Sequence, residues 1–134
     1  MAERPRSDFA VLAGGILMLL ASLAHSFVGG PALLEELARE GVNADNTAGM
    51  LVGWLFGGTA MGLLGILTII GYRRLRRGDD GARSTLFAIG AFWILFGLGA
   101  SLYRFPSPHF LGFLVIGGLV CIPPSVWPWQ LPRK

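Results

Sequence analysis

The stretch Met50–Ile70, MLVGWLFGGTAMGLLGILTII, decides the fold, because none of its residues is acidic or basic. An α-helix of about 20 apolar residues crosses the roughly 30 Å hydrocarbon core of a bilayer. Three further stretches share this character: Phe9–Val28, Thr85–Tyr103 and the shorter Phe110–Val126. The sequence therefore predicts an all-α integral membrane four-helix bundle that forms one domain over residues 1–134.

The bulk composition agrees with this class. Of the 134 residues, 53% are hydrophobic and 14% are charged, and both values depart from those of soluble domains in the membrane direction. The single cysteine, Cys121, excludes an internal disulfide and a Cys-x-x-Cys redox pair. It lies in the fourth apolar stretch, where we expect a buried and inert thiol.

The charged residues divide unevenly between the ends of the predicted spans. The second connection holds five arginines, whereas the first connection is mostly acidic, with Glu35, Glu36, Glu40 and Asp45 against Arg39. Basic residues in short loops favour the cytoplasmic side. We therefore predict that both termini and the second connection are cytoplasmic, and that the protein resides in a bacterial inner membrane.

The arginine run has two other interpretations, since basic clusters also bind nucleic acid or anionic lipid. Membrane topology accounts for the run without either partner, and contact with lipid headgroups would accompany it. The neighbouring Asp79 and Asp80 argue against a nucleic acid. The predicted partners are the bilayer itself and a membrane protein or second copy of the chain, with no nucleic acid.

The first connection has a helical pattern of its own. Pro31 suits the start of a helix, and Gly41 suits its end. Leucines of Pro31–Glu40 share one face, which predicts a short amphipathic helix that lies on the outer membrane surface or caps the bundle. Asn46 or Thr47 is expected to cap the second span.

Two alternatives concern the first span. Arg4 and Arg6 precede an apolar run that ends in Ser22-Leu23-Ala24, a format that also fits a cleaved signal peptide. The length of the run and the charge balance favour a retained span. A weak similarity between Ala21–Phe27 and Ala100–Phe105 is compatible with a two-fold repeat or with chance.

Small residues predict how the spans associate. Helices in lipid gain little from apolar burial, and they associate where small residues allow close approach. The second span has the most glycines, and we expect it to be the central and most tightly packed helix. The predicted packing residues are Gly53, Gly57, Gly58, Gly62, Gly97 and Ser101.

Polar groups gather at the level of the predicted outer interface. His25 is the sharpest candidate, because desolvating a histidine in a span is costly and often serves a function. An interfacial histidine bonded to water or a serine is the simpler alternative. The candidate ligand-binding residues are His25, Trp54, Tyr103, Arg104, His109 and Asp45.

No motif among these residues indicates a reaction. The spacing of His25, His109 and Asp45 supports no metal site, and no cofactor is predicted. Ser22 or Ser26 beside His25 lacks the geometry of a nucleophile and its base. The middle of each span has no ionisable residue, which argues against transport. We leave open whether the chain is an enzyme and prefer a non-enzymatic role.

Two hypotheses of function remain. The first is a small polytopic inner-membrane protein that serves as an accessory or assembly subunit, or that self-associates. The second is a binder of, or an enzyme acting on, a lipid, isoprenoid or quinone-type amphipathic ligand. Its pocket would open to the outer leaflet around His25, Tyr103 and Arg104.

Overall fold

The computed structural model describes residues 7–103 and 110–126, and every regular element in these ranges is a helix. The elements, in chain order, are α1 (Ser7–Leu23), the π-helix η1 (Ala24–Gly29), α2 (Gly30–Arg39), α3 (Ala44–Arg76), α4 (Gly81–Tyr103) and α5 (Leu111–Val126).

Three helical segments are long and apolar enough to cross a membrane: Phe9–Arg39, Ala44–Arg76 and Gly81–Tyr103. A fourth apolar helix, Leu111–Pro123, is shorter. These lengths follow from the apolar stretches of the sequence, and they indicate a membrane protein. The all-helical fold predicted from the sequence is confirmed for the residues that the structure describes.

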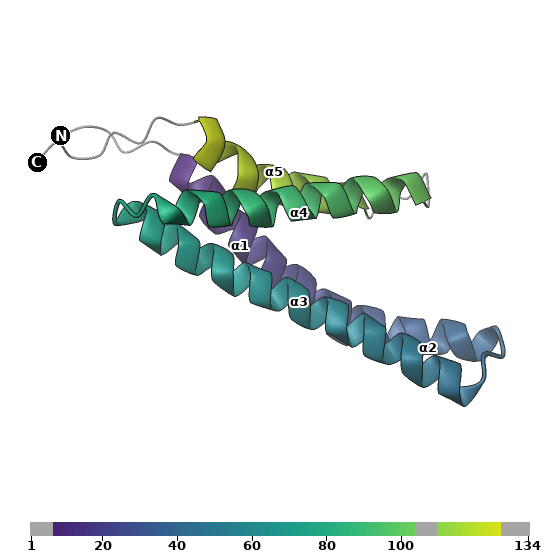
Figure 1. The fold of residues 1–134 in the computed structure, drawn as a ribbon. Coiled ribbons are helices and arrows are strands. Elements are labelled where there is room, and N and C mark those ends of the chain that lie inside the picture. Colours follow the sequence, from purple (N-terminus) through teal and green to yellow (C-terminus); the bar gives the residue numbers. More distant parts are fainter. Residues whose placement is uncertain (1–6, 104–109, 127–134) are drawn as a thin grey trace, which may run out of the picture.

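The helices form two pairs (Figure 1). In the first pair α1 packs along α3, and α2 continues beside the start of α3. In the second pair α4 packs along α5. The pairs meet at the end where α3 turns into α4, and they diverge toward the other end, where α2 passes into α3 (Figure 1).

The buried core explains why the pairs hold together at one end. Along α4 the last core residue is Trp93, near the middle of that helix, and along α1 the last core residue is Met18. The core joins all four long helices through Val11, Met18, Tyr72, Leu75, Ala82, Leu86, Ile89, Trp93, Ile116 and Val120. Beyond it, large apolar side chains such as Phe56 and Leu102 are exposed.

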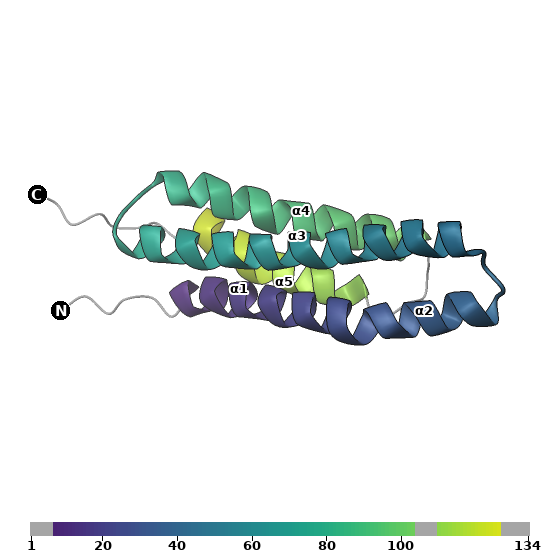
Figure 2. The same ribbon diagram turned by 90° about the horizontal axis from the view of Figure 1, so that it is seen from below.

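The amphipathic helix of the first connection exists, but its predicted position is wrong. It spans Gly30–Arg39 and is continuous with α1 through η1, rather than lying separately on the surface or capping the bundle (Figure 2). A proline inside a helix clashes with the carbonyl four residues earlier. For Pro31 that residue is Phe27, which lies in the wider π turn, and this turn gives the ring room.

The second span also differs from expectation. The helix begins at Ala44, and its cap is Asn43, whose side chain accepts a hydrogen bond from the Asn46 backbone N–H at 2.9 Å; the prediction of Asn46 or Thr47 was wrong. Nor is this helix the most tightly packed. In its most apolar stretch of 18 residues only 11% of the residues are buried, whereas the corresponding value for α4 is 28%.

Two glycines end helices in the same way. Gly41 has φ +68° and Gly78 has φ +83°, values that other residues adopt only with strain. After α3, the Gly78 N–H donates to the Leu75 carbonyl and the Asp79 N–H to the Arg74 carbonyl. This pattern is a Schellman motif, which satisfies the last carbonyls of the helix and turns the chain toward α4.

Candidate functional site

The most specific side-chain contact between helices joins His25 of η1 to Trp54 of α3. Their rings stack with centroids 4.0 Å apart and planes inclined by 7°. The Trp54 indole N–H donates to the His25 carbonyl at 2.7 Å, and the His25 Nε2 lies 3.1 Å from the Trp54 carbonyl oxygen. We call this reciprocal arrangement the His25–Trp54 clasp.

The clasp requires a hydrogen on one ring nitrogen of its histidine. A carbonyl oxygen only accepts, so Nε2 of His25 must carry the hydrogen that it donates to the Trp54 carbonyl.

The π turn makes the second hydrogen bond of the clasp possible. A π turn departs from the i→i−4 ladder of an α-helix, and a carbonyl in it can accept from a side chain. The His25 carbonyl does so.

Glycines give the clasp its space. A Cβ atom on Gly29 would lie 2.8 Å from the Trp54 ring, and one on Gly58 would lie 3.3 Å from Cδ2 of His25. One turn away, the Ser22 hydroxyl donates to the Gly58 carbonyl at 2.7 Å. Together these contacts bring the backbones of η1 and α3 into close approach, as small residues permit in a membrane.

The other predicted ligand-binding residues do not join this contact. Tyr103 ends α4, which diverges from η1 and α3, and its side chain is 90% exposed (Figure 1). Asp45 is exposed in the first turn of α3. Arg104 and His109 lie outside the described residues. Within the described part of the chain, the structure brings together only His25 and Trp54 among these candidates.

The predicted packing residues have different surroundings. Gly58 and Gly62 face Ser26 and Ser22 of the first helical segment. Gly97 faces Phe113 and Leu114 of α5, and Gly57 faces His25. In contrast, Gly53 has no neighbour within 4 Å of the place where a Cβ would stand. The Ser101 hydroxyl is buried and has no hydrogen-bond partner among the described residues.

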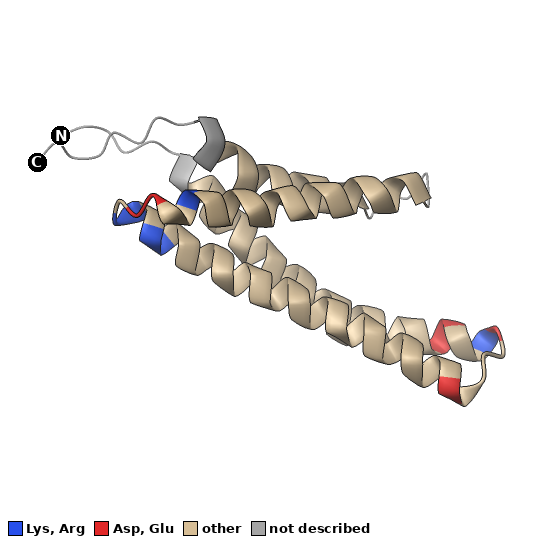
Figure 3. Cartoon of the chain, in the orientation of Figure 1, with Lys and Arg blue, Asp and Glu red and all other residues tan. Residues whose placement is uncertain are grey.

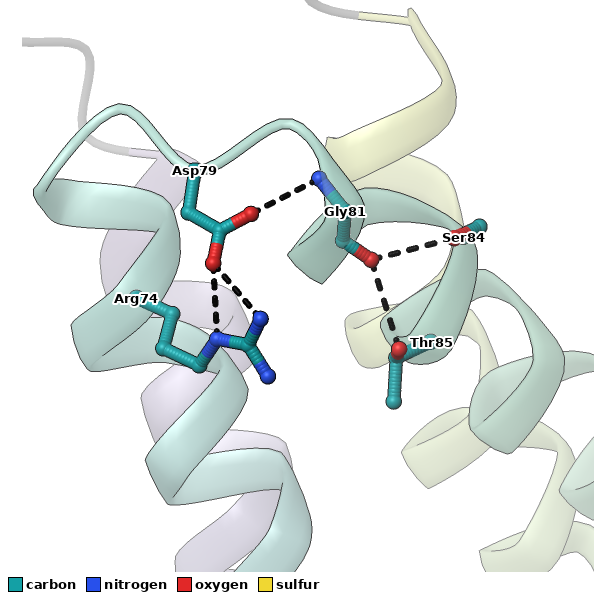
Figure 4. Close-up of polar contacts among 5 residues, drawn as sticks. All are labelled: Arg74, Asp79, Gly81, Ser84 and Thr85. Atoms are coloured by element: carbon teal, nitrogen blue, oxygen red, sulfur yellow. Dashed lines mark hydrogen bonds and ion pairs between the residues drawn. The ribbon is translucent and has the colours of Figure 1, made fainter.

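The charged residues of the described chain lie at the two ends of the molecule, with none between them (Figure 3). At the basic end, Asp79 organises the turn between α3 and α4. Its carboxylate accepts from Arg74 Nε at 2.8 Å and from the Gly81 N–H at 2.9 Å, while the Ser84 and Thr85 hydroxyls donate to the Gly81 carbonyl (Figure 4). These bonds link the end of α3 to the start of α4.

Asp79 should make stability depend on pH at the acidic end of the scale. The hydrogen bond from Arg74 lowers the pKa of Asp79 below its ordinary value of 3.8. A carboxyl whose pKa is depressed on folding stabilises the fold above its unfolded pKa, and this contribution disappears as the pH falls through the folded pKa. We expect Asp79→Asn to remove a small fall in melting temperature below pH 3.8. Glu35→Gln, at the opposite end, should retain it; equal profiles in both variants would contradict this role.

Two features were not anticipated from the sequence as parts of a site. The Ser22–Gly58 bond joins residues far apart in the chain, and its only signal was a pair of serines flanking His25 in an apolar run. Trp93 is 3% exposed, and its indole N–H has no acceptor among the described residues. A buried indole N–H normally has an acceptor.

The described residues contain no group of three or more His, Cys, Asp or Glu side chains placed to hold a metal ion. The contacts around His25 instead occupy its Nε2, its carbonyl and one face of its ring. Comparison of the chain with protein-family models, with curated proteins and with solved structures finds no match.

Proposed function

We propose that the protein is a non-enzymatic accessory, assembly or self-associating subunit of a bacterial cytoplasmic membrane, built as a four-span bundle. The divergence of the two helix pairs carries this proposal (Figure 1). Beyond the core, apolar helix faces of both pairs have no partner within the described chain, as the exposed Phe56 and Leu102 illustrate. An accessory subunit needs such faces to meet another membrane protein.

Charge supports a single orientation in the membrane. The turn between α3 and α4 is rich in arginine, whereas the far end of the molecule carries four acidic residues against the single Arg39 (Figure 3). The start of α1 and the end of α5 lie at the arginine end (Figure 1). The preference of basic loops for the cytoplasm supports an arrangement with this end inside.

Helix length supports a projecting acidic tip. At 1.5 Å per residue, the 33 residues of α3 extend for about 50 Å, well beyond the roughly 30 Å of hydrocarbon. The excess lies at both ends, and at the far end α2 accompanies it. Glu36 and Arg39 form an ion pair at 3.0 Å there, with most of each side chain exposed. A tip of this kind suits contact with a partner outside the bilayer.

The face of α3 opposite α1 is the best surface for association within the bilayer. Gly49 and Gly53 lie one turn apart, and neither has an atom within 4 Å of a potential Cβ. Phe56, on the same face, is 75% exposed. The ring of one copy can pack against the bare glycine backbone of another, which is the close approach that drives helix association in lipid.

A cross-linking experiment tests this surface. In a Cys121→Ala background, Gly53→Cys should yield a disulfide-linked dimer or an adduct with a partner protein in native membranes. Leu20→Cys, which places a thiol on an exposed position of α1, is the matched control. We expect severalfold more product from the α3 position. Equal yields from both positions, together with a strictly monomeric and partnerless chain in mild detergent, would refute the proposal.

The same preparation tests the second candidate, an amphipathic ligand of the lipid, isoprenoid or quinone type. The observation that favours it is the indole N–H of Trp93, the last core residue along α4, which has no acceptor among the described residues. A ligand oxygen would supply the acceptor that the described residues do not. Native mass spectrometry of the partnerless monomer would then show one retained ligand, and Trp93→Phe would lose it.

A further inference from the structure

The basic end of the molecule carries more positive charge than its own carboxylates neutralise. Five arginines and two aspartates lie between positions 73 and 83. Asp79 binds Arg74 at 2.7 Å, and Asp80 lies 3.5 Å from Arg83. Among the described residues no ion pair joins a carboxylate to the remaining three arginines, Arg73, Arg76 and Arg77.

Two of these three arginines share one exposed face. Arg73 lies in the last turn of α3 and Arg77, four positions later, is the residue that caps this helix; both are exposed. Side chains at this spacing are neighbours, with Cβ atoms about 5–6 Å apart. Two guanidinium groups can therefore reach the oxygens of one phosphate, for which their planar donor sets are suited. Arg76 turns elsewhere, since it donates to the Tyr72 hydroxyl at 3.2 Å.

The depth of this pair matches a lipid headgroup. Ile70 ends the apolar stretch of α3, so at 1.5 Å per residue Arg73 lies about 5 Å and Arg77 about 10 Å beyond it. The headgroup layer of a bilayer is roughly 5–8 Å thick on each side. Long arginine side chains can also reach back toward the apolar region.

The turn holds the pair in place. The Schellman motif at Gly78 follows the C-cap Arg77 directly, and the bonds of Asp79 to Arg74 and to Gly81 fix the end of α3 against the start of α4 (Figure 4). The backbone that carries both arginines is thus ordered before any ligand arrives, which lowers the entropic cost of binding.

We infer that Arg73 and Arg77 form a binding surface for the phosphate of an anionic phospholipid in the adjacent leaflet. Charge complementarity selects the partner. A zwitterionic headgroup offers its own cation to compete for the phosphate, whereas an anionic headgroup does not. The inference rests on the membrane placement and not on self-association, so either proposal can fail without the other.

The test is retention of lipid by the purified full-length chain in native mass spectrometry, with phosphatidylglycerol or phosphatidylcholine supplied in the micelles. We expect the wild-type protein to retain phosphatidylglycerol preferentially and inorganic phosphate not to displace it. Each arginine near an anionic surface contributes enough that loss of two should weaken retention roughly 10- to 30-fold in Arg73→Gln/Arg77→Gln. Arg39→Gln, at the acidic end, should leave retention unchanged.

The charge-preserving variant Arg73→Lys/Arg77→Lys guards against a folding defect. It keeps the charge at both positions and should retain far more phosphatidylglycerol than the glutamine variant. The inference is overturned if the wild-type chain retains both lipids equally, if inorganic phosphate displaces the lipid, or if Arg39→Gln loses as much lipid as the double glutamine variant. The first two outcomes are read on the unmodified protein and do not depend on any variant folding.

Discussion

Gly90→Ala should cost about 3 kcal/mol of stability, at the upper end of the range for inserting a methyl group into a packed interior. A Cβ on Gly90 would lie 2.6 Å from the backbone nitrogen and 2.6 Å from the Cβ of Cys121, and 2.8 Å from its Cα. These atoms belong to the backbone of α5 or lie next to it, so no rotamer change can make room. The two helices must separate, and the α4–α5 pair loosens.

The contact is mutual, which strengthens the prediction. On the other helix, a Cβ on Gly117 would lie 2.7 Å from the Gly90 carbonyl oxygen and 2.9 Å from the Ile94 backbone nitrogen. The crossing of α4 and α5 is therefore made by two glycines, each of which faces the backbone of the other helix: Gly90 faces Cys121, and Gly117 faces Gly90 and Ile94. Such approach is what small residues provide between helices in lipid, where apolar burial adds little.

The measurement is unfolding of the purified protein by increasing SDS in mixed micelles, followed by circular dichroism. Gly99→Ala is the matched control, because this glycine lies on the same helix with nothing within 4 Å of a potential Cβ. It should be neutral or slightly stabilising, since alanine favours the helix over glycine by up to about 1 kcal/mol. If both variants unfold at the same SDS fraction, the close α4–α5 crossing is wrong.

The second large effect concerns the His25–Trp54 clasp: His25→Ala and Trp54→Ala should each cost about 2 kcal/mol, and a double-mutant cycle should show a coupling free energy of about 1 kcal/mol. Side-chain hydrogen bonds within membranes average about 0.6 kcal/mol and reach about 1.7 kcal/mol. The clasp has two such bonds and a ring stack, and a stacked aromatic pair adds about 0.5–1.5 kcal/mol. Each bond joins one side chain to the backbone carbonyl of the other residue, so a single alanine substitution removes one bond and the ring stack, and the coupling in the cycle reports the stack.

The cycle compares His25→Ala, Trp54→Ala and the double variant in the same SDS titration. Thr59→Ala is the control, because its exposed hydroxyl donates only to the Leu55 carbonyl of its own helix. Additive losses at His25 and Trp54 would show that the two rings do not stack, and single losses no larger than that of the control would show that the clasp does not form. The same His25→Ala sample tests the ligand pocket that the sequence predicts around this residue, which is a different place from Trp93 and from the arginines; unchanged retention of an isoprenoid or quinone-type ligand would rule that pocket out.

The sequence identifies both residues of the clasp as candidates, but it does not predict that they contact each other. His25 and Trp54 were both named as candidates, because each carries a polar group in an apolar span. Nothing local indicates that they stack, since the pairing needs a π turn at Ala24–Gly29 and the close approach of α3. Tyr103 was grouped with them by its predicted depth alone, and it lies on the other helix pair.

The glycines show the same division. Gly53 and Gly58 are indistinguishable as members of small-residue motifs, yet one faces open space and the other faces Ser26 and His25. Which side of a helix meets a neighbour depends on where that neighbour lies. The position of Pro31 likewise suggested a new helix, whereas the preceding π turn lets the existing one continue.

The amino-acid sequence alone indicates that this protein belongs in a lipid bilayer and that its apolar stretches are helices. Long apolar runs have lower free energy in hydrocarbon, and there the backbone must satisfy its own hydrogen bonds, so the runs form helices with charges at both ends. Only the tertiary structure decided that the helices pair as α1–α3 and α4–α5, that the pairs diverge, and that His25 binds Trp54. These outcomes depend on contacts between residues that are distant in the chain. In lipid, shape complementarity and close backbone approach decide which helices associate, and hydrophobicity does not.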